Sequence, residues 1–188
     1  MFRNLIAGLG LCGAMLAGAA SAAPESEASL REQLLAANWP AEVVRLAADY
    51  RRRFPRGPNV ADAAARAERA ARAQQALESR DVNLSRNAFS AAAGVPALRA
   101  DAERALLADG DAALRISHAY RDGQDTAAEP QRQLEWLRYA AALDAAEANY
   151  ELALHYRQQG QMPMAAKYQA RAAELGFVLP RELDSVRK

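Results

Sequence analysis

Cysteine and histidine are almost absent from this sequence. It has one cysteine, Cys12, and two histidines, His118 and His155. Cys12 lies in an N-terminal segment that we expect to be removed, so the mature chain would have no disulfide, no catalytic thiol and no cysteine-bound metal. The two histidines have neither a third ligand nor a residue that would orient them as ligands. We therefore predict no metal site and no cofactor, and we assign both histidines to packing or surface roles.

The sequence has no marked excess of positive or negative charge either. The chain has 24 basic and 23 acidic residues, and its formal net charge is +1. Removing residues 1–22, whose only charged side chain is Arg3, leaves 166 residues with 23 of each sign. Nucleic-acid-binding proteins typically carry a basic excess, so this balance argues against a nucleic-acid partner. A chain of this length forms one ordinary domain with a core of its own.

No apolar run in the sequence reaches the ~20 residues that a membrane-spanning helix needs. Residues 5–16 form an apolar run that follows the basic Arg3 and precedes the small-residue pattern Ala-Ser-Ala at 20–22. This is the order of a signal peptide, with cleavage after Ala22. A lipoprotein signal would require a small residue before Cys12, where the chain has leucine. We predict export to the periplasm without stable membrane insertion; lipid-anchored and fully secreted forms are the alternatives.

Residues that favour strands are scarce, since Ile and Val are few and Ala is frequent. Ala costs the least free energy in a helix, and β-branched side chains supply most strands. Apolar residues recur at three-to-four spacing, and Pro and Gly interrupt these stretches. The sequence therefore predicts an all-α fold, with Asn59 as the N-cap of a long Ala-rich helix. The expected helices are 29–37, 40–53, 60–78, 88–93, 97–108, 111–122, 130–143, 145–158 and 163–175.

Two segments in the C-terminal half are similar to each other. The first contains ALRISHAYRDG followed by LEWLRYAAAL, and the second contains NYELALHYRQQG followed by AKYQARAAELG. Tyr120 aligns with Tyr156 at an offset of 36, and Trp136 aligns with Tyr168 at an offset of 32. The offsets differ because the second segment has a shorter loop. We expect these four aromatic side chains to lie in the core.

The repeated pattern resembles the Sel1-like repeat, a relative of the tetratricopeptide repeat. Its features are an Ala-rich first helix, an aromatic residue followed by Gly, a loop, a second helix with an aromatic residue, and an Ala-Ala pair before a small polar turn. The resemblance covers residues 111–176 and implies an α-solenoid of stacked antiparallel helical hairpins, with Phe177 and Leu179 covering the last hairpin. It divides the chain into a signal peptide at 1–22, an N-terminal helical region at 23–109 that is either degenerate repeats or a cap, two repeats at 110–178 and a C-terminal tail at 179–188.

Three positions depart from the family pattern. Asp125 stands in place of a loop Gly, and Asp144 with Ala145 replaces the usual Gly turn. Asp tolerates the left-handed backbone region that Gly favours, so we expect both turns to form. Gln133 stands where the family has a small Ala, and we expect it to push its two helices slightly apart.

Motifs of catalysis are missing as well. The sequence has no Gly-x-Ser-x-Gly elbow and no phosphate-binding loop. Acidic residues are many, but nothing marks a pocket that would shift the pKa of one of them for acid–base work, so we predict that the chain is not an enzyme. The densest basic cluster, residues 51–53 with Arg56, lies at a helix end, where the helix dipole stabilises cations. Contact with anionic lipid or an acidic partner is the alternative reading of this cluster.

The predicted function is that of a non-enzymatic, exported scaffold or adaptor that binds a protein or peptide in the cell envelope. Stacked hairpins present a groove suited to such a partner, although no motif encodes the partner's identity or the oligomeric state. The alternative is an accessory protein that binds polysaccharide or peptidoglycan in an envelope assembly or secretion system. Rigid aromatic and polar side chains concentrate binding energy. The residues expected in the groove on that ground are Arg115, His118, Tyr139, Asn149 and Tyr150.

Far-UV circular dichroism of the mature chain tests the helical prediction. The spectrum should be dominated by helix, because Ala-rich segments with helical periodicity make up most of the chain. A substantial strand contribution to the spectrum would contradict the fold class.

Overall fold

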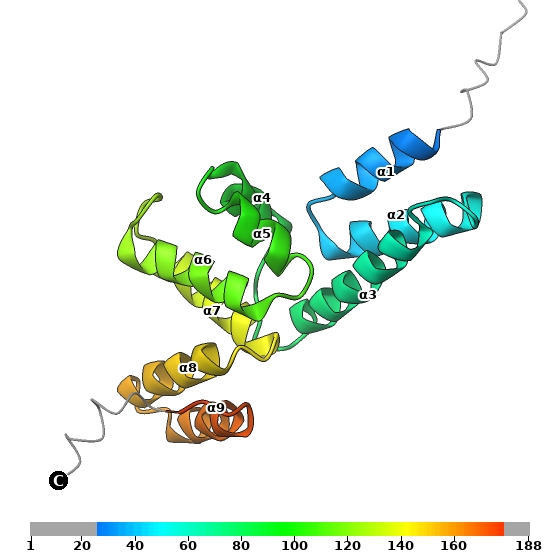
Figure 1. Ribbon diagram of the computed structural model, residues 1–188. Coiled ribbons are helices and arrows are strands. Elements are labelled where there is room, and N and C mark those ends of the chain that lie inside the picture. Colours follow the sequence, from blue (N-terminus) through cyan, green and yellow to red (C-terminus); the bar gives the residue numbers. More distant parts are fainter. Residues whose placement is uncertain (1–25, 179–188) are drawn as a thin grey trace, which may run out of the picture.

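The computed structural model describes residues 26–178 (Figure 1). Over this range the chain folds into nine α-helices and no strand, which confirms the all-α prediction. No helix in that range is both long and apolar enough to cross a membrane. The predicted signal peptide and the tail, including Leu179, lie outside the described residues. The helices are α1 (Glu27–Ala36), α2 (Pro40–Arg53), α3 (Val60–Leu77), α4 (Arg86–Gly94), α5 (Arg99–Ala105), α6 (Gly110–Asp122), α7 (Pro130–Ala142), α8 (Ala146–Gln158) and α9 (Met162–Glu174).

Capping by serine decides where two helices begin. The Ser26 hydroxyl oxygen accepts a hydrogen bond from the Ser29 N–H at 3.1 Å, and the Ser85 hydroxyl accepts one from the Ala88 N–H at 3.3 Å. As a result α1 and α4 each begin two residues earlier than expected. Asn59 precedes α3, but the prediction that its side chain caps this helix is wrong. Its φ of −103° and ψ of 12° lie outside the extended region that a capping residue typically adopts.

Helices α5, α7 and α9 end with the same kind of turn. Each is followed by a residue with left-handed backbone, namely Ala108 with φ 63°, Asp144 with φ 64° and Gly176 with φ 81°. After each of these, the next N–H donates to a carbonyl five residues back, which satisfies a carbonyl at the helix end. The bonds are Asp109 to Arg104 at 3.1 Å, Ala145 to Ala140 at 3.1 Å and Phe177 to Ala172 at 2.9 Å.

The three turns follow the spacing of the repeat. Ala108 precedes Asp144 by 36 residues, and Asp144 precedes Gly176 by 32, the same offsets that align the aromatic residues. Asp125 also has a left-handed backbone, with φ 63°, so the prediction that both Asp turns form is confirmed. The shared turn extends the regularity back to α5, beyond the region in which the sequence shows it. Helix α5 ends at residue 105, earlier than expected, because residues 106–108 form this turn.

Consecutive helices pack in pairs, with α2 beside α3, α6 beside α7 and α8 beside α9 (Figure 1). Helices α6 to α9 have 13 residues each. The buried Ser117 hydroxyl on α6 donates a hydrogen bond of 2.8 Å to the backbone carbonyl of Gln133 on α7. The small serine thus brings α6 within side-chain hydrogen-bonding distance of the α7 backbone at Gln133 itself.

Four aromatic rings connect the N-terminal helices with α7. Phe89 on α4 lies at the centre, with its ring centroid 5.6 Å from Trp39, 4.9 Å from Trp136 and 5.6 Å from Tyr139. All three contacts are edge-to-face, the arrangement that aromatic pairs prefer. We call these four residues the aromatic cluster. It fixes the turn between α1 and α2 against α4 and α7.

The aromatic residues of the repeat lie in the core, as predicted. Tyr120, Trp136, Tyr156 and Tyr168 are each at most 7% exposed. The rings of Tyr156 and Tyr168 stack with centroids 5.4 Å apart. Phe177 stacks on Tyr150 at 4.7 Å, so the predicted cover of the last hairpin by Phe177 is confirmed.

Trp136→Ala should lower the free energy of unfolding by about 3 kcal/mol or more, because it removes a fully buried ring from the aromatic cluster. Trp136→Phe should cost clearly less. It keeps a ring in the cluster, and the indole Nε1 that it removes has no hydrogen-bond partner among residues 26–178. Urea unfolding followed by circular dichroism measures both changes. A loss below about 1 kcal/mol for the alanine variant would contradict this placement of the ring.

Candidate functional site

Two of the five residues predicted for a groove are buried and hydrogen-bonded inside the protein. Tyr139 belongs to the aromatic cluster, and its hydroxyl donates to the Ala105 carbonyl at 2.9 Å. Burial raises the pKa of Tyr139 above its ordinary value, so this phenol stays protonated. Asn149 is 1% exposed, and its amide nitrogen donates to the carbonyls of Ala141 at 3.2 Å and Ala145 at 2.9 Å. These two side chains hold helix ends together through buried hydrogen bonds to backbone carbonyls.

The other three predicted groove residues each contact a neighbour. Arg115 on α6 forms an ion pair of 2.6 Å with Asp101 on α5. His118 lies 2.8 Å from Glu151 on α8, and Tyr150 stacks on Phe177. The five residues therefore come from three helices, α6, α7 and α8, and two of them lie in the core. A different part of the surface combines a hollow with polar groups that lack internal partners.

The hollow lies between α1 and α3 on one side and α4 and α5 on the other, and we call it the interarm cleft. Figure 1 shows α1–α3 as an arm that points away from α4 and α5. The cleft has a basic part of about 490 Å³ and an apolar part of about 170 Å³. Both parts are lined by Leu35, Ala37, Glu103 and Leu106, so they form one continuous depression.

The apolar part lies at the end of α1. Its lining includes the buried side chains of Phe89, Ala102 and Leu106, together with the partly buried Ala93. Leu35 stands at its edge and is 43% exposed, which makes it one of few large apolar side chains on the surface of the described region. Leu35 therefore extends the apolar lining of this hollow to the protein surface.

The basic part is lined by arginines from both walls. Arg66 and Arg69 come from α3, and Arg104 comes from α5. Within residues 26–178, Arg66 and Arg69 form no ion pair or hydrogen bond, and the Nε atom of Arg66 is buried. A buried donor without a partner costs free energy, because it has lost water without gaining another acceptor. Of the polar groups in this cleft, Arg66 is therefore the one with most to gain from a hydrogen-bond acceptor supplied by a partner.

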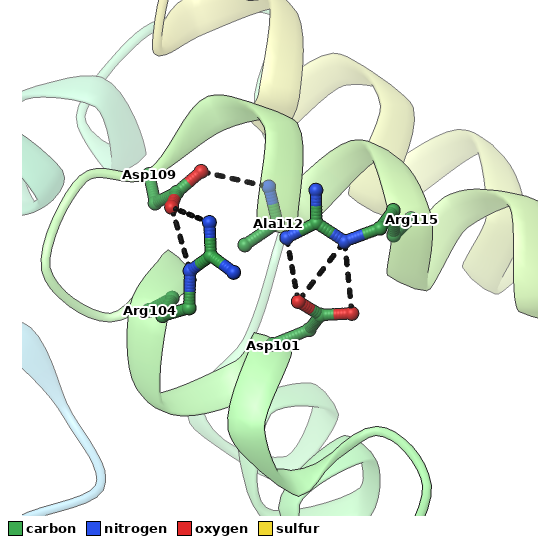
Figure 2. Close-up of polar contacts among 5 residues, drawn as sticks. All are labelled: Asp101, Arg104, Asp109, Ala112 and Arg115. Carbon is green, nitrogen blue, oxygen red and sulfur yellow. Dashed lines mark hydrogen bonds and ion pairs between the residues drawn. The ribbon is translucent and has the colours of Figure 1, made fainter.

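Figure 2 shows how the α5 wall of the cleft is held. One oxygen of Asp109 accepts a hydrogen bond of 2.9 Å from the Ala112 N–H and so caps α6. The other accepts one of 2.9 Å from Arg104, which fixes that guanidinium. Both oxygens of Asp101 accept hydrogen bonds from Arg115, between 2.6 and 3.1 Å. The two carboxylates fasten α5 to α6 and leave Arg104 already paired.

The α1 side is fastened to α4 in a similar way. The Asn38 amide donates to the Ser90 hydroxyl at 3.3 Å, and Arg86 pairs with Glu42 at 2.9 Å. Trp39 adds its edge-to-face contact with Phe89. The apolar end of the cleft is therefore lined by side chains that are held in place from both sides.

A second hollow of about 380 Å³ lies between α7, α9 and the segment that follows α3. Its lining is charged but mostly paired. Asp81 accepts hydrogen bonds from Lys167 at 2.7 Å and from the Tyr168 hydroxyl at 3.0 Å, and Lys167 lowers the pKa of Asp81. Arg171 pairs with Asp144 at 2.7 Å. The bonds to Asp81 tie the segment before α4 to α9, and the Arg171–Asp144 pair ties α9 to the turn between α7 and α8, so we interpret this hollow as a structural junction.

The histidines are accounted for by local contacts. His118 contacts Glu151, and His155 lies 3.0 Å from the amide nitrogen of Gln159. Burial, together with the charge of Arg138, lowers the pKa of His155, which favours its neutral form. Among residues 26–178, no group of three or more histidine, cysteine, aspartate or glutamate side chains could hold a metal ion.

No family model, no curated protein and no solved structure matches this chain. The resemblance to Sel1-like repeats therefore rests on the sequence pattern itself. The features of this chain that bear on its function are the interarm cleft and the side chains that line it.

The carboxylate of Asp109 makes the stability of the fold at this wall depend on pH. Burial alone would raise the pKa of Asp109, but the Ala112 N–H and the Arg104 guanidinium outweigh it and hold the pKa below the ordinary value of 3.8. The ionised carboxylate therefore stabilises the fold at pH values above 3.8. This stabilisation is lost as the pH falls through the lower pKa of the folded state.

Asp109→Asn should lower the free energy of unfolding by about 1 kcal/mol at pH 7, because the amide can still cap α6 but cannot pair as an anion with Arg104. The difference from the unaltered chain should shrink as the pH falls below about 4, since the native carboxylate then becomes protonated. Urea unfolding over a series of pH values measures this convergence. Asp125→Asn, which removes a carboxylate from an exposed loop, is the matched control, and a difference for Asp109→Asn that stays constant with pH would contradict the assignment.

Proposed function

We propose that this chain is a non-enzymatic interaction scaffold of the cell envelope, which binds a protein or peptide partner in the interarm cleft. The observation that carries the proposal is the pairing, in one depression, of an apolar hollow with the arginines Arg66 and Arg69, which have no partner among the described residues. Arginine and buried apolar anchors are the groups in which interface binding energy concentrates. A leader with the signal-peptide pattern supports the placement in the envelope.

The scaffold itself is an α-solenoid in which residues 110–178 form two Sel1-like repeats. Four helices of equal length and the recurrence of one turn after α5, α7 and α9 support this arrangement. The first helices of the two repeats end alike as well, because the Tyr120 carbonyl accepts from Glu129 and the Tyr156 carbonyl from Gln161, both at 2.9 Å. The shared turn after α5 supports reading α4 and α5 as a shortened preceding repeat.

A polysaccharide-binding role would be favoured by aromatic rings exposed as stacking platforms. Within residues 26–178 no aromatic side chain is exposed. Trp136 is fully buried, and Trp39 packs its ring against Phe89. A protein or peptide partner suits the cleft better, because it can supply both an apolar anchor and polar groups for the arginines.

Photo-crosslinking in intact cells tests the proposal. A photoreactive benzophenone amino acid placed at Leu35, on the edge of the cleft, should give a discrete adduct with a partner protein in the periplasmic fraction. Met162, on α9, is a matched control, because it is also a large apolar side chain and is 58% exposed. The same label at Met162 should not give this adduct. Equal labelling from both positions, or no adduct from Leu35, would count against a partner in the cleft.

A further inference from the structure

From the chemistry of the interarm cleft we infer that its occupant is an acidic amphipathic helix. The helix places one large apolar side chain in the apolar part and carboxylates on Arg66 and Arg69. This inference rests on the proposed function and names the chemical class of the partner.

The size of the apolar part favours a single anchoring side chain. Its volume of about 170 Å³ is well below the roughly 300 Å³ or more that small-molecule pockets usually have. The buried rings and methyl groups of Phe89, Ala102 and Leu106 offer an apolar contact and no free hydrogen-bonding group from these side chains. An aliphatic or aromatic side chain from a partner fits this hollow, and its burial would also cover Leu35.

The spacing of the arginines favours a helical ligand with carboxylates. Arg66 and Arg69 are three residues apart on α3 and so lie on one face, about 4.5 Å apart along the helix axis. Two glutamates three residues apart on a partner helix have the same rise. Guanidinium groups bind carboxylates through paired hydrogen bonds, which makes arginine specific for planar anions.

The acidic groups in the cleft limit how negative the occupant is. Asp109 is already engaged by Arg104 and the Ala112 N–H, whereas Glu103 has no ion pair within residues 26–178. Both lie in the lining with the three arginines, so the basic excess is small. A polyanion such as nucleic acid would meet the repulsion of Glu103 and would leave the apolar part empty. A peptide with two or three carboxylates around an apolar residue satisfies both parts.

Fluorescence anisotropy with the full mature chain tests this inference. The probe is a labelled amphipathic peptide of about 15 residues, roughly four helical turns, with leucine along one face and glutamate one turn apart beside it. Two matched peptides carry glutamine in place of every glutamate or alanine in place of every leucine. Each matched peptide should bind at least about tenfold more weakly than the probe, because each loses one of the two complementary contacts.

Variants of the protein show where on its surface the peptide binds. Arg66→Gln with Arg69→Gln should weaken binding of the glutamate peptide at least about tenfold and leave binding of the glutamine peptide unchanged. Arg51→Gln with Arg56→Gln removes the same charge from exposed positions at the end of α2 and should have little effect. Ala93→Met fills the apolar part and should abolish binding without lowering the thermal unfolding midpoint, which serves as the folding control.

The results test separately that the partner is acidic, that it binds in the cleft, and that a peptide binds at all. Equal affinity for the glutamate and glutamine peptides, with Ala93→Met still blocking both, would overturn the acidic partner but keep peptide binding in the cleft. Binding that survives Ala93→Met, or that falls with the Arg51 and Arg56 changes instead, would place the peptide elsewhere and overturn the inference. If no peptide binds at all, the inference fails, and crosslinking from Leu35 decides separately whether the cleft has a partner.

Discussion

The packing of Phe89 against three other aromatic rings is the contact on which the arrangement of this protein depends. Phe89 lies on α4, a helix of nine residues that is too short to be stable by itself. Its ring meets Trp39 from the N-terminal arm and Trp136 and Tyr139 from α7. The arm is therefore held at its base, while α1 and α3 diverge from α5 (Figure 1). Phe89 also lines the apolar part of the interarm cleft, so the cleft lies directly beside this tightly packed joint.

Ion pairs at the surface orient these elements more than they stabilise them. Exposed pairs such as Arg86 with Glu42 contribute about 0–1 kcal/mol each, far less than burial of the aromatic rings. Their value lies in geometry, because Arg104 is held on Asp109 and α5 is fastened to α6 (Figure 2). Within the same cleft, Arg66 and Arg69 have no hydrogen-bond or ion-pair partner among the described residues, whereas Arg104 is paired with Asp109. This contrast is what gives the cleft its chemical character.

The recurrence of this left-handed turn after α5, α7 and α9 was only partly visible in the sequence. Turns at Gly123, Gly160 and Gly176 could be predicted, because glycine adopts the left-handed backbone at little cost, and Asp144 could be included because aspartate tolerates it. Ala108 occupies the equivalent position after α5, but alanine has no preference for that conformation, so no sequence signal marked the turn. The backbone strain there is outweighed by the packing around it. The regularity thus extends further in the structure than in the residue pattern.

The sequence by itself determined the helices, most of the turns and the four core aromatics of the repeat. These features depend on local properties, namely helix propensity, periodic apolar positions and the conformational preferences of Gly, Pro and Asp. Only the tertiary structure decided which polar side chains are satisfied internally, since Tyr139 and Asn149 bond to backbone atoms of neighbouring turns. The cleft likewise draws its lining from α1, α3, α4 and α5. Residues so far apart in the chain share no local pattern, and their meeting depends on how the helices pack.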